Sequence, residues 1–178
     1  MRAFIGISIP EELKPKIKEI QNKFSKFDIK FVEPENLHFN LKFFKDLRNT
    51  EKVKGKLKDI SSHFKPFEIK IAGIGAFPSK NYIRVIWLGV KEGYQQLVSL
   101  AKFIQSSLEE LGYTEEEFVP HLTLGRVRTG KNKNEIIMLL NELENVEIGN
   151  MEVKEIKLFQ SKLTPTGPIY NEVFRIIL

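Results

Sequence analysis

The chain has 178 residues, of which 42% are hydrophobic and 29% charged, a balance that excludes disordered and fibrous proteins. It contains no cysteine, which excludes disulfides, thiolate zinc sites, iron–sulfur clusters and cysteine nucleophiles. The net charge of +5 permits a polyanionic partner. The apolar stretches are only strand-length, and a single basic residue stands near the start. We therefore expect no membrane span and no signal peptide, and a cytoplasmic protein.

The first half of the chain alternates strand and helix patterns. Alternating apolar residues predict a strand over 3–9, and apolar spacings of three and four predict a helix between Leu13 and Phe27. Because proline is tolerated only in the first turn of a helix, Pro15 places the start of the regular helix near residue 14. The later elements expected are strands over 29–32, 37–44 and 66–74, and a helix over 53–64.

The second half repeats this rhythm. Helices are expected over 97–111 and 133–144, and strands over 81–90, 119–127, 151–159 and 169–177, with turn chemistry at 164–168. No linker rich in proline or serine separates the halves. The sequence therefore predicts one bilobed α+β domain over residues 1–178, with mixed or antiparallel sheets, each backed by helices.

One short motif, histidine followed by an apolar residue, Asn or Thr, and Leu, occurs once in each half. Because alternate residues of a strand share a face, His38 is expected to project with Asn40, and His121 with Thr123. If the halves pack symmetrically, these four side chains converge. The residues expected on the opposite, buried face of the first strand are Phe39, Leu41 and Phe43.

Two facing histidines suit acid–base chemistry at phosphorus. An imidazole has a pKa near about 6.5 and exchanges a proton at neutral pH, while a hydroxyl or carboxamide two residues on can donate to an anionic oxygen. One histidine would activate the nucleophile and the other would protonate the leaving oxygen, without a metal. A metal site is the competing interpretation, but neither strand face offers an acidic residue or a third histidine. His63 is expected on the surface.

These residues resemble the 2H phosphoesterase superfamily, in its bacterial and archaeal branch of RNA 2′,3′-cyclic phosphodiesterases, also called 2′-5′ RNA ligases. The resemblance covers segments 2–7, 32–38, 73–78, 118–126 and 161–170. It implies two pseudo-symmetric lobes with a cleft between them. It also implies the opening of RNA 2′,3′-cyclic phosphate ends to 2′-phosphates, with RNA as the partner and no cofactor. Position 40 departs from the family, which usually has Thr or Ser there.

The resemblance and the strand pattern together suggest roles for single residues. We expect His121 to accept a proton from water, His38 to donate one to the leaving oxygen, and Asn40 and Thr123 to bind phosphate. By strict alternation Arg126 points away from His121, unless a bulge at Gly125 directs it toward a phosphate. Further candidate RNA contacts are Tyr82, Arg84 and Ser161.

Two alternatives to a hydrolase stay open at this point. The first is a ligase that joins tRNA halves, with hydrolysis as a side reaction, because it would use the same histidines. The second is a non-catalytic RNA-binding protein, motivated by Asn40 and the positive charge. Under each of these hypotheses we expect a monomer.

Overall fold

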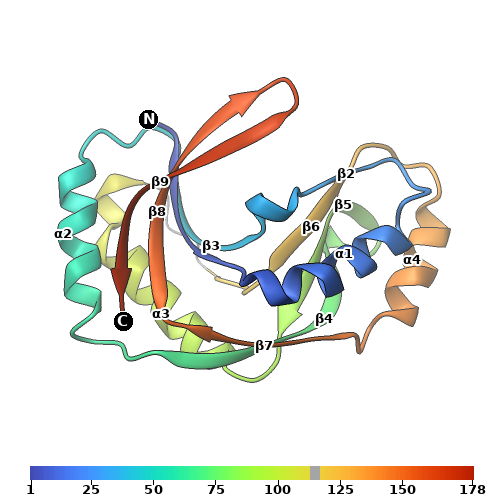
Figure 1. The fold of residues 1–178 in the computed structure, drawn as a ribbon. Helices are drawn as coiled ribbons and strands as arrows, with labels where there is room; N and C mark the ends of the chain where they lie inside the picture. Colours follow the sequence, from blue (N-terminus) through green and yellow to red (C-terminus); the bar gives the residue numbers. More distant parts are fainter. Residues whose placement is uncertain (113–116) are drawn as a thin grey trace.

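The computed structural model describes residues 1–112 and 117–178, which hold four α-helices and nine strands (Figure 1). The helices are α1 (Lys14–Lys23), α2 (Thr50–Ile60), α3 (Tyr94–Ser107) and α4 (Lys133–Glu142), with 3-10 turns η1 (Glu11–Leu13), η2 (Pro34–Asn36) and η3 (Glu109–Leu111). The strands are β1 (Ala3–Ser8), β2 (Ile29–Phe31), β3 (His38–Phe44), β4 (Phe67–Ser79), β5 (Tyr82–Val90), β6 (Leu122–Val127), β7 (Glu147–Val153), β8 (Glu155–Thr164) and β9 (Gly167–Ile177).

The elements follow the sequence pattern with one clear exception. Pro15 lies in the first turn of α1, as predicted from its fixed φ and missing N–H. The strand predicted over 151–159 was wrong, because β7 ends at Val153 and β8 begins at Glu155. The buried residues change phase at this point, from Met151 and Val153 to Ile156 and Leu158. That shift by one residue marks a break in a period-two pattern.

The sheet is antiparallel throughout and consists of two halves. Its order is β7-β4-β5-β6-β3-β1-β8-β9, with β2 added on β6. Strands β3 and β6 join the halves, and they pair at Phe39 and Leu122. The α+β class is therefore confirmed. The two sheets expected from the sequence are instead connected into one by this backbone pairing.

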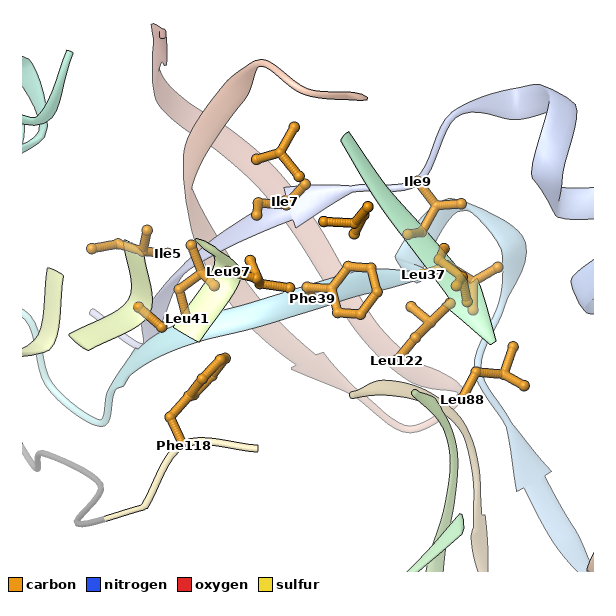
Figure 2. Packing of buried hydrophobic residues seen from close by; sticks show 14 of the residues in the cluster. Ile5, Ile7, Ile9, Leu37, Phe39, Leu41, Leu88, Leu97, Phe118 and Leu122 are labelled. Carbon is orange, nitrogen blue, oxygen red and sulfur yellow. The ribbon is translucent and has the colours of Figure 1, made fainter. Parts of the chain in front are cut away.

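Two helices cross from one half of the molecule to the other. Helix α1 follows β1 in the chain but contacts β6, whereas α3 follows β5 but contacts β3. Phe39, which is fully buried, lies at the centre of the core, with Leu97 of α3 and Leu122 of β6 beside it (Figure 2). One hydrophobic core thus serves both halves. Among the residues described, no helix is long and apolar enough to span a membrane.

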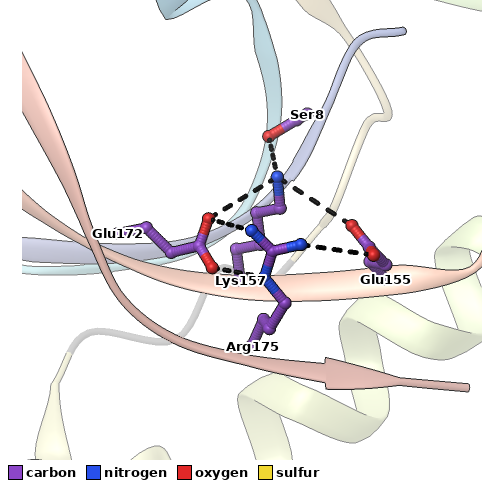
Figure 3. Close-up of polar contacts among 5 residues, drawn as sticks. All are labelled: Ser8, Glu155, Lys157, Glu172 and Arg175. Atoms are coloured by element: carbon purple, nitrogen blue, oxygen red, sulfur yellow. Dashed lines mark hydrogen bonds and ion pairs between the residues drawn. The ribbon is translucent and has the colours of Figure 1, made fainter.

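A cluster of charged residues ties β1, β8 and β9 together (Figure 3). Lys157 Nζ lies 3.3 Å from Ser8 Oγ, 3.7 Å from Glu172 and 3.9 Å from Glu155. Arg175 pairs with both carboxylates. Pairs that are partly exposed contribute only about 0–1 kcal/mol each, so the backbone pairing of these strands contributes more to their positions than the cluster does. Ser8 stands opposite His38 in the register of β1 and β3, which places this cluster next to the first histidine motif.

Candidate active site

A cleft of about 800 Å³ lies where the two halves meet, and it contains both histidine motifs. The predicted site residues that line it are His38, Asn40, His121, Thr123, Arg126 and Ser161. The other lining residues are Arg2, Phe4, Lys30, Phe31, Val32, Glu33, Glu35, Asn36, Phe43, Thr164, Thr166, Gly167, Pro168, Ile169 and Tyr170. The convergence expected from strand alternation is therefore observed.

The two histidines are held by the same kind of hydrogen bond. His38 is the first residue of β3, and His121 lies one residue before β6 rather than within it as predicted. Nδ1 of His38 donates to the carbonyl of Asn36 over 2.6 Å, and Nδ1 of His121 donates to the carbonyl of Val119 over 2.7 Å. Because a carbonyl oxygen can only accept, the proton of each neutral ring lies on Nδ1. Each Nε2 is thereby left to act on a substrate.

Aromatic rings surround both imidazoles. His38 stacks on Phe4 with the ring centroids 4.4 Å apart, and the ring of Tyr170 stands perpendicular to it with the centroids 5.4 Å apart. His121 meets Phe77 edge-on at 4.8 Å. Burial lowers the pKa of His38, the hydrogen bond to Asn36 works in the opposite direction, and charge on His121 lowers the pKa further. His38 is therefore mainly neutral at pH 7 in the free protein.

A β-bulge turns Arg126 toward the cleft. Ile86 and Trp87 of β5 pair with Gly125 and Thr123, so that Leu124 is the extra residue on β6. An extra residue reverses the alternation beyond it. Arg126, which strict alternation places on the buried face, thus lines the cleft on the side of Thr123. The bulge falls at Leu124 rather than at Gly125, the position suggested by the sequence.

An equivalent bulge in β3 overturns the prediction for Phe43. Ile5 and Gly6 of β1 pair with Lys42 and Asn40, so that Leu41 is the extra residue. Phe43 was expected in the core with Phe39, but beyond the bulge it lines the cleft and is 36% exposed. The guanidinium of Arg2 lies 4.4 Å from the centre of its ring. Phe43 and Arg2 thus form one wall of the cleft.

Each bulge is hydrogen-bonded to a buried glutamine from the helix that crosses over to it. Nε2 of Gln21 on α1 donates to the carbonyls of Leu124 and Val32, both over 3.0 Å. Nε2 of Gln105 on α3 donates to the carbonyl of Leu41 over 3.1 Å. Both glutamines are almost fully buried, so their amides depend on these acceptors. The helices thereby fix the backbone next to each motif.

The hairpin of β8 and β9 closes one side of the cleft. Nδ2 of Asn36 donates to the carbonyl of Pro168 over 3.0 Å, and Nζ of Lys30 donates to the carbonyl of Thr166 over 3.3 Å. Tyr170 of the same hairpin faces His38, and burial raises the pKa of its phenol, so the hydroxyl stays protonated. Ser161, predicted as an RNA contact, is buried in the same hairpin, opposite Tyr170.

The sequence did not single out several of these cleft residues. Arg2, Lys30, Phe43 and Tyr170 were not predicted as site residues, although Arg2 and Tyr170 lie in segments that carry the family resemblance. The family resemblance of those segments was the only feature of the sequence that could have pointed to these two residues. No local periodicity reveals that residue 170 approaches residue 38.

Tyr82 and Arg84, also predicted as RNA contacts, lie outside the histidine cleft. They line a separate groove of about 330 Å³ with residues of the segment 127–133. The Tyr82 hydroxyl accepts hydrogen bonds from Nε of Arg84 over 2.8 Å and from its Nη2. The structure therefore separates these two residues from the six predicted residues that line the cleft.

Within 1–112 and 117–178, no three His, Cys, Asp or Glu side chains gather as a set of metal ligands. The carboxylates of Glu33 and Glu35 border the cleft from the exposed turn η2 and its flank. Nδ1 of each histidine is already bound to a carbonyl. The cleft thus offers two imidazoles, neutral donors, three cationic side chains (Arg2, Lys30 and Arg126) and two carboxylates at its border.

Comparison with known proteins agrees with this site. The sequence profile of the 2′-5′ RNA ligase superfamily matches residues 9–164. A Methanothermobacter thermautotrophicus protein named RNA 2′,3′-cyclic phosphodiesterase is 42% identical over 183 aligned positions, covering 99% of both chains. A protein of the same name from Methanocaldococcus jannaschii is 42% identical over 174 positions, covering 97% of this chain and 98% of its own.

Solved structures show the same fold. A crystal structure from Thermus thermophilus superimposes with a TM-score of 0.85 at 24% identity, covering 100% of this chain and 98% of the other. E. coli LigT in complex with 3′-AMP gives a TM-score of 0.76 at 24% identity, with 99% and 97% coverage. Taken with the two histidine motifs in one cleft, these matches show that the chain belongs to the 2′-5′ RNA ligase superfamily.

Proposed function

We propose that this protein hydrolyses RNA 2′,3′-cyclic phosphate ends to 2′-phosphomonoesters by acid–base catalysis, without a metal. The observation that carries the proposal is the pair of histidines in one cleft, each with Nδ1 bound to a carbonyl and Nε2 left for the substrate. The relatives named RNA 2′,3′-cyclic phosphodiesterase support the same substrate.

In the proposed reaction, Nε2 of His121 takes a proton from a water molecule as its oxygen attacks phosphorus. The bond from phosphorus to the 3′-oxygen breaks, and Nε2–H of His38 gives its proton to that oxygen, which leaves a 2′-phosphate and a 3′-hydroxyl. A lowered pKa makes the imidazolium of His38 a stronger acid. The bound phosphate anion favours the protonated form of His38 before the reaction.

The phosphate is bound by neutral and charged donors. In this proposal the amide of Asn40 and the hydroxyl of Thr123 donate to the non-bridging oxygens, and Arg126 balances their charge. Ser161 of the hairpin lines the cleft and is proposed to contact the terminal nucleotide. The protein is proposed to act as a monomer, on RNA in the cytoplasm.

The proposal includes a pseudo-two-fold relation between the halves. In each half the histidine donates to the carbonyl two residues before it, and a bulge follows three residues after it, at Leu41 and Leu124. In each half a glutamine from a crossing helix binds the bulged residue. Such paired local features are what a duplicated strand–helix unit would produce.

Mass analysis of a short RNA with a 2′,3′-cyclic phosphate end tests the proposal. The expected product is the 2′-phosphate, formed equally well in EDTA. His38→Ala and His121→Ala should each lower turnover by about 10²–10⁴-fold with unchanged circular dichroism. The double variant should be little worse than either single variant, because the pair acts as a unit. A metal-dependent rate, or one histidine that can be removed without loss, would show that the mechanism is wrong.

Ligation of tRNA halves is the second candidate, favoured by the superfamily to which the chain belongs. The same histidines would protonate and deprotonate ribose hydroxyls in place of water. Incubation with tRNA halves that carry cyclic or 2′-phosphate ends separates the two functions, by scoring joined against opened ends. RNA that is bound but unchanged in both assays would instead indicate a non-catalytic RNA-binding protein.

A further inference from the structure

A second groove, outside the histidine cleft, has the composition of a site for a polyanion. Its volume is about 330 Å³, and its described lining holds four cationic residues and no acidic one. The cationic residues are Arg84, Arg128, Lys131 and Lys133, all of them exposed. Arg128 lies 3.5 Å from Asp28, whereas the other three make no ion pair with any residue of 1–112 or 117–178. The groove therefore carries uncompensated positive charge.

The groove also presents an aromatic ring in a fixed position. Tyr82 is 56% exposed, and the guanidinium of Arg84 lies 5.1 Å from the centre of its ring while donating to its hydroxyl. The side chains of this pair hold each other in place before any ligand binds. An exposed ring beside cations is the combination that binds single-stranded nucleic acid, because bases stack on the ring and phosphates meet the charges.

The groove and the cleft are neighbours along β6. Arg126 lines the cleft, whereas Val127 and Arg128, the next residues of the chain, line the groove. The cleft itself has the volume of a site for a small ligand, so a longer RNA strand must leave it. Because consecutive residues of a strand point to opposite faces, an RNA that leaves the cleft reaches the groove by passing over the end of β6.

We propose that this groove binds the single-stranded RNA that precedes the terminal nucleotide, with Tyr82 stacking on a base and the cations binding phosphates. The inference rests on the proposed function for the identity of the ligand. It predicts an enzyme that acts better on RNA oligomers than on nucleoside 2′,3′-cyclic monophosphates, which reach the cleft alone.

The test measures the parent and a variant on two substrates. In the variant, Arg84, Lys131 and Lys133 are each replaced by Ala. On an RNA of about ten nucleotides with a cyclic phosphate end, kcat/KM should fall about tenfold or more. Its dependence on salt should weaken by roughly 0.7 in log–log slope for each lost phosphate contact. On the nucleoside 2′,3′-cyclic monophosphate, kcat/KM should stay within about twofold of the parent.

A control variant removes the same charge elsewhere, by changing the exposed residues Lys18, Lys65 and Lys102 to Ala. It should behave like the parent on both substrates. Equal losses in the groove and control variants on the oligomer would reduce the effect to overall charge and overturn the proposal. A groove variant that loses equally on both substrates would also overturn it, because the residues would then act in the cleft.

Binding separates this proposal from the proposed function. An RNA of about ten nucleotides that ends in a 3′-hydroxyl cannot be hydrolysed at a cyclic end, so its fluorescence anisotropy reports binding without turnover, and the difference between the variants reports the groove. The groove variant should bind this RNA about tenfold more weakly than the control variant. Tyr82→Phe should retain more binding than Tyr82→Ala, since it keeps the ring. Equal binding by all variants would sink the inference even if the enzyme hydrolyses its substrate.

Discussion

The hydrogen bonds on Nδ1 determine which nitrogen each histidine offers to a substrate. A neutral imidazole free to choose its tautomer would spend part of its time with the proton on Nε2, where it cannot accept another. The carbonyls of Asn36 and Val119 remove that choice for His38 and His121. Each ring therefore stands ready to accept a proton, and a second proton makes it a donor through the same atom.

The lowered pKa of His38 can be measured directly. In the parent protein, NMR titration of the ring should give a pKa below the ordinary value of about 6.5. His121→Ala should raise that pKa, because it removes a neighbouring positive charge, but burial should keep it below the ordinary value. His63→Ala, which changes an exposed ring just beyond the end of α2, should leave it unchanged. An unaltered pKa in His121→Ala would contradict the electrostatic contact between the two histidines.

Asn40 tests the proposed binding of phosphate by the first motif. A neutral donor to a charged acceptor contributes about 1.5–3 kcal/mol. Asn40→Ala should thus lower kcat/KM for the cyclic phosphate by about ten- to a hundredfold. Asn40→Asp should be worse because its carboxylate repels the phosphate, and Asn40→Thr should be active. If Asn40→Ala matched the parent, another group would have to bind the phosphate there.

At the scale of elements, the bulges connect the helices to the chemistry. Gln21 on α1 binds the carbonyl of Leu124, and the bulge at Leu124 directs Arg126 into the cleft. Gly6 of β1 lies opposite Asn40, and a Cβ there would be 2.8 Å from the Phe39 carbonyl. A side chain at Gly6 would thus force the histidine strand to move. Strand geometry, rather than sequence spacing alone, sets the direction of the site residues.

Gln21→Met should show this connection in its kinetics. The change removes a buried donor to Leu124 and Val32 and should cost about 1–3 kcal/mol of stability, measured by urea unfolding. It should also lower kcat/KM, and the loss should largely disappear in an Arg126→Met background, because Gln21 acts through Arg126. Gln96→Met, on an exposed face of α3, is the control. Fully additive losses would mean that Gln21 only stabilises the fold.

The alternation of residues within single strands predicted part of this site. It missed the residues whose direction depends on contacts with distant parts of the chain. The faces of His38, Asn40 and Thr123 follow from two-residue alternation, which needs no knowledge of the partner strands. The direction of Phe43 depends on the bulge at Leu41, which is held by Gln105 from 64 residues away in the chain. No period within residues 38–44 contains that information. Tyr170 of the hairpin was missed for the same reason, because its contact with His38 is distant in sequence.

At the scale of the whole molecule, the crossing helices make the halves interdependent. The core is continuous through Phe39, and α1 and α3 each pack on a strand of the other half. Neither half can therefore expose its core without disturbing the other. The protein should unfold as one unit even though its cleft divides it into two.

This cooperativity is measurable because the only tryptophan, Trp87, lies in β5. Its fluorescence reports the second half, while far-ultraviolet circular dichroism reports the whole chain. The two urea transitions should coincide. Phe39→Ala should shift both together, by about 3–5 kcal/mol, since the lost ring lies between the halves. A Trp87 transition that precedes or follows the circular dichroism would indicate separate folding units.

The turn between β4 and β5, at Lys80, is exposed, so the chain can be divided there between the two crossing helices. A chain cut there yields one fragment with His38 and another with His121. Each fragment retains a helix that packs on a strand of the other fragment, α1 on β6 and α3 on β3. We therefore expect the two fragments to associate when they are mixed. Neither could open a cyclic phosphate alone, and their mixture would regain activity only as they associate. Fused to two interacting proteins, the fragments would form a split enzyme whose RNA product reports the encounter.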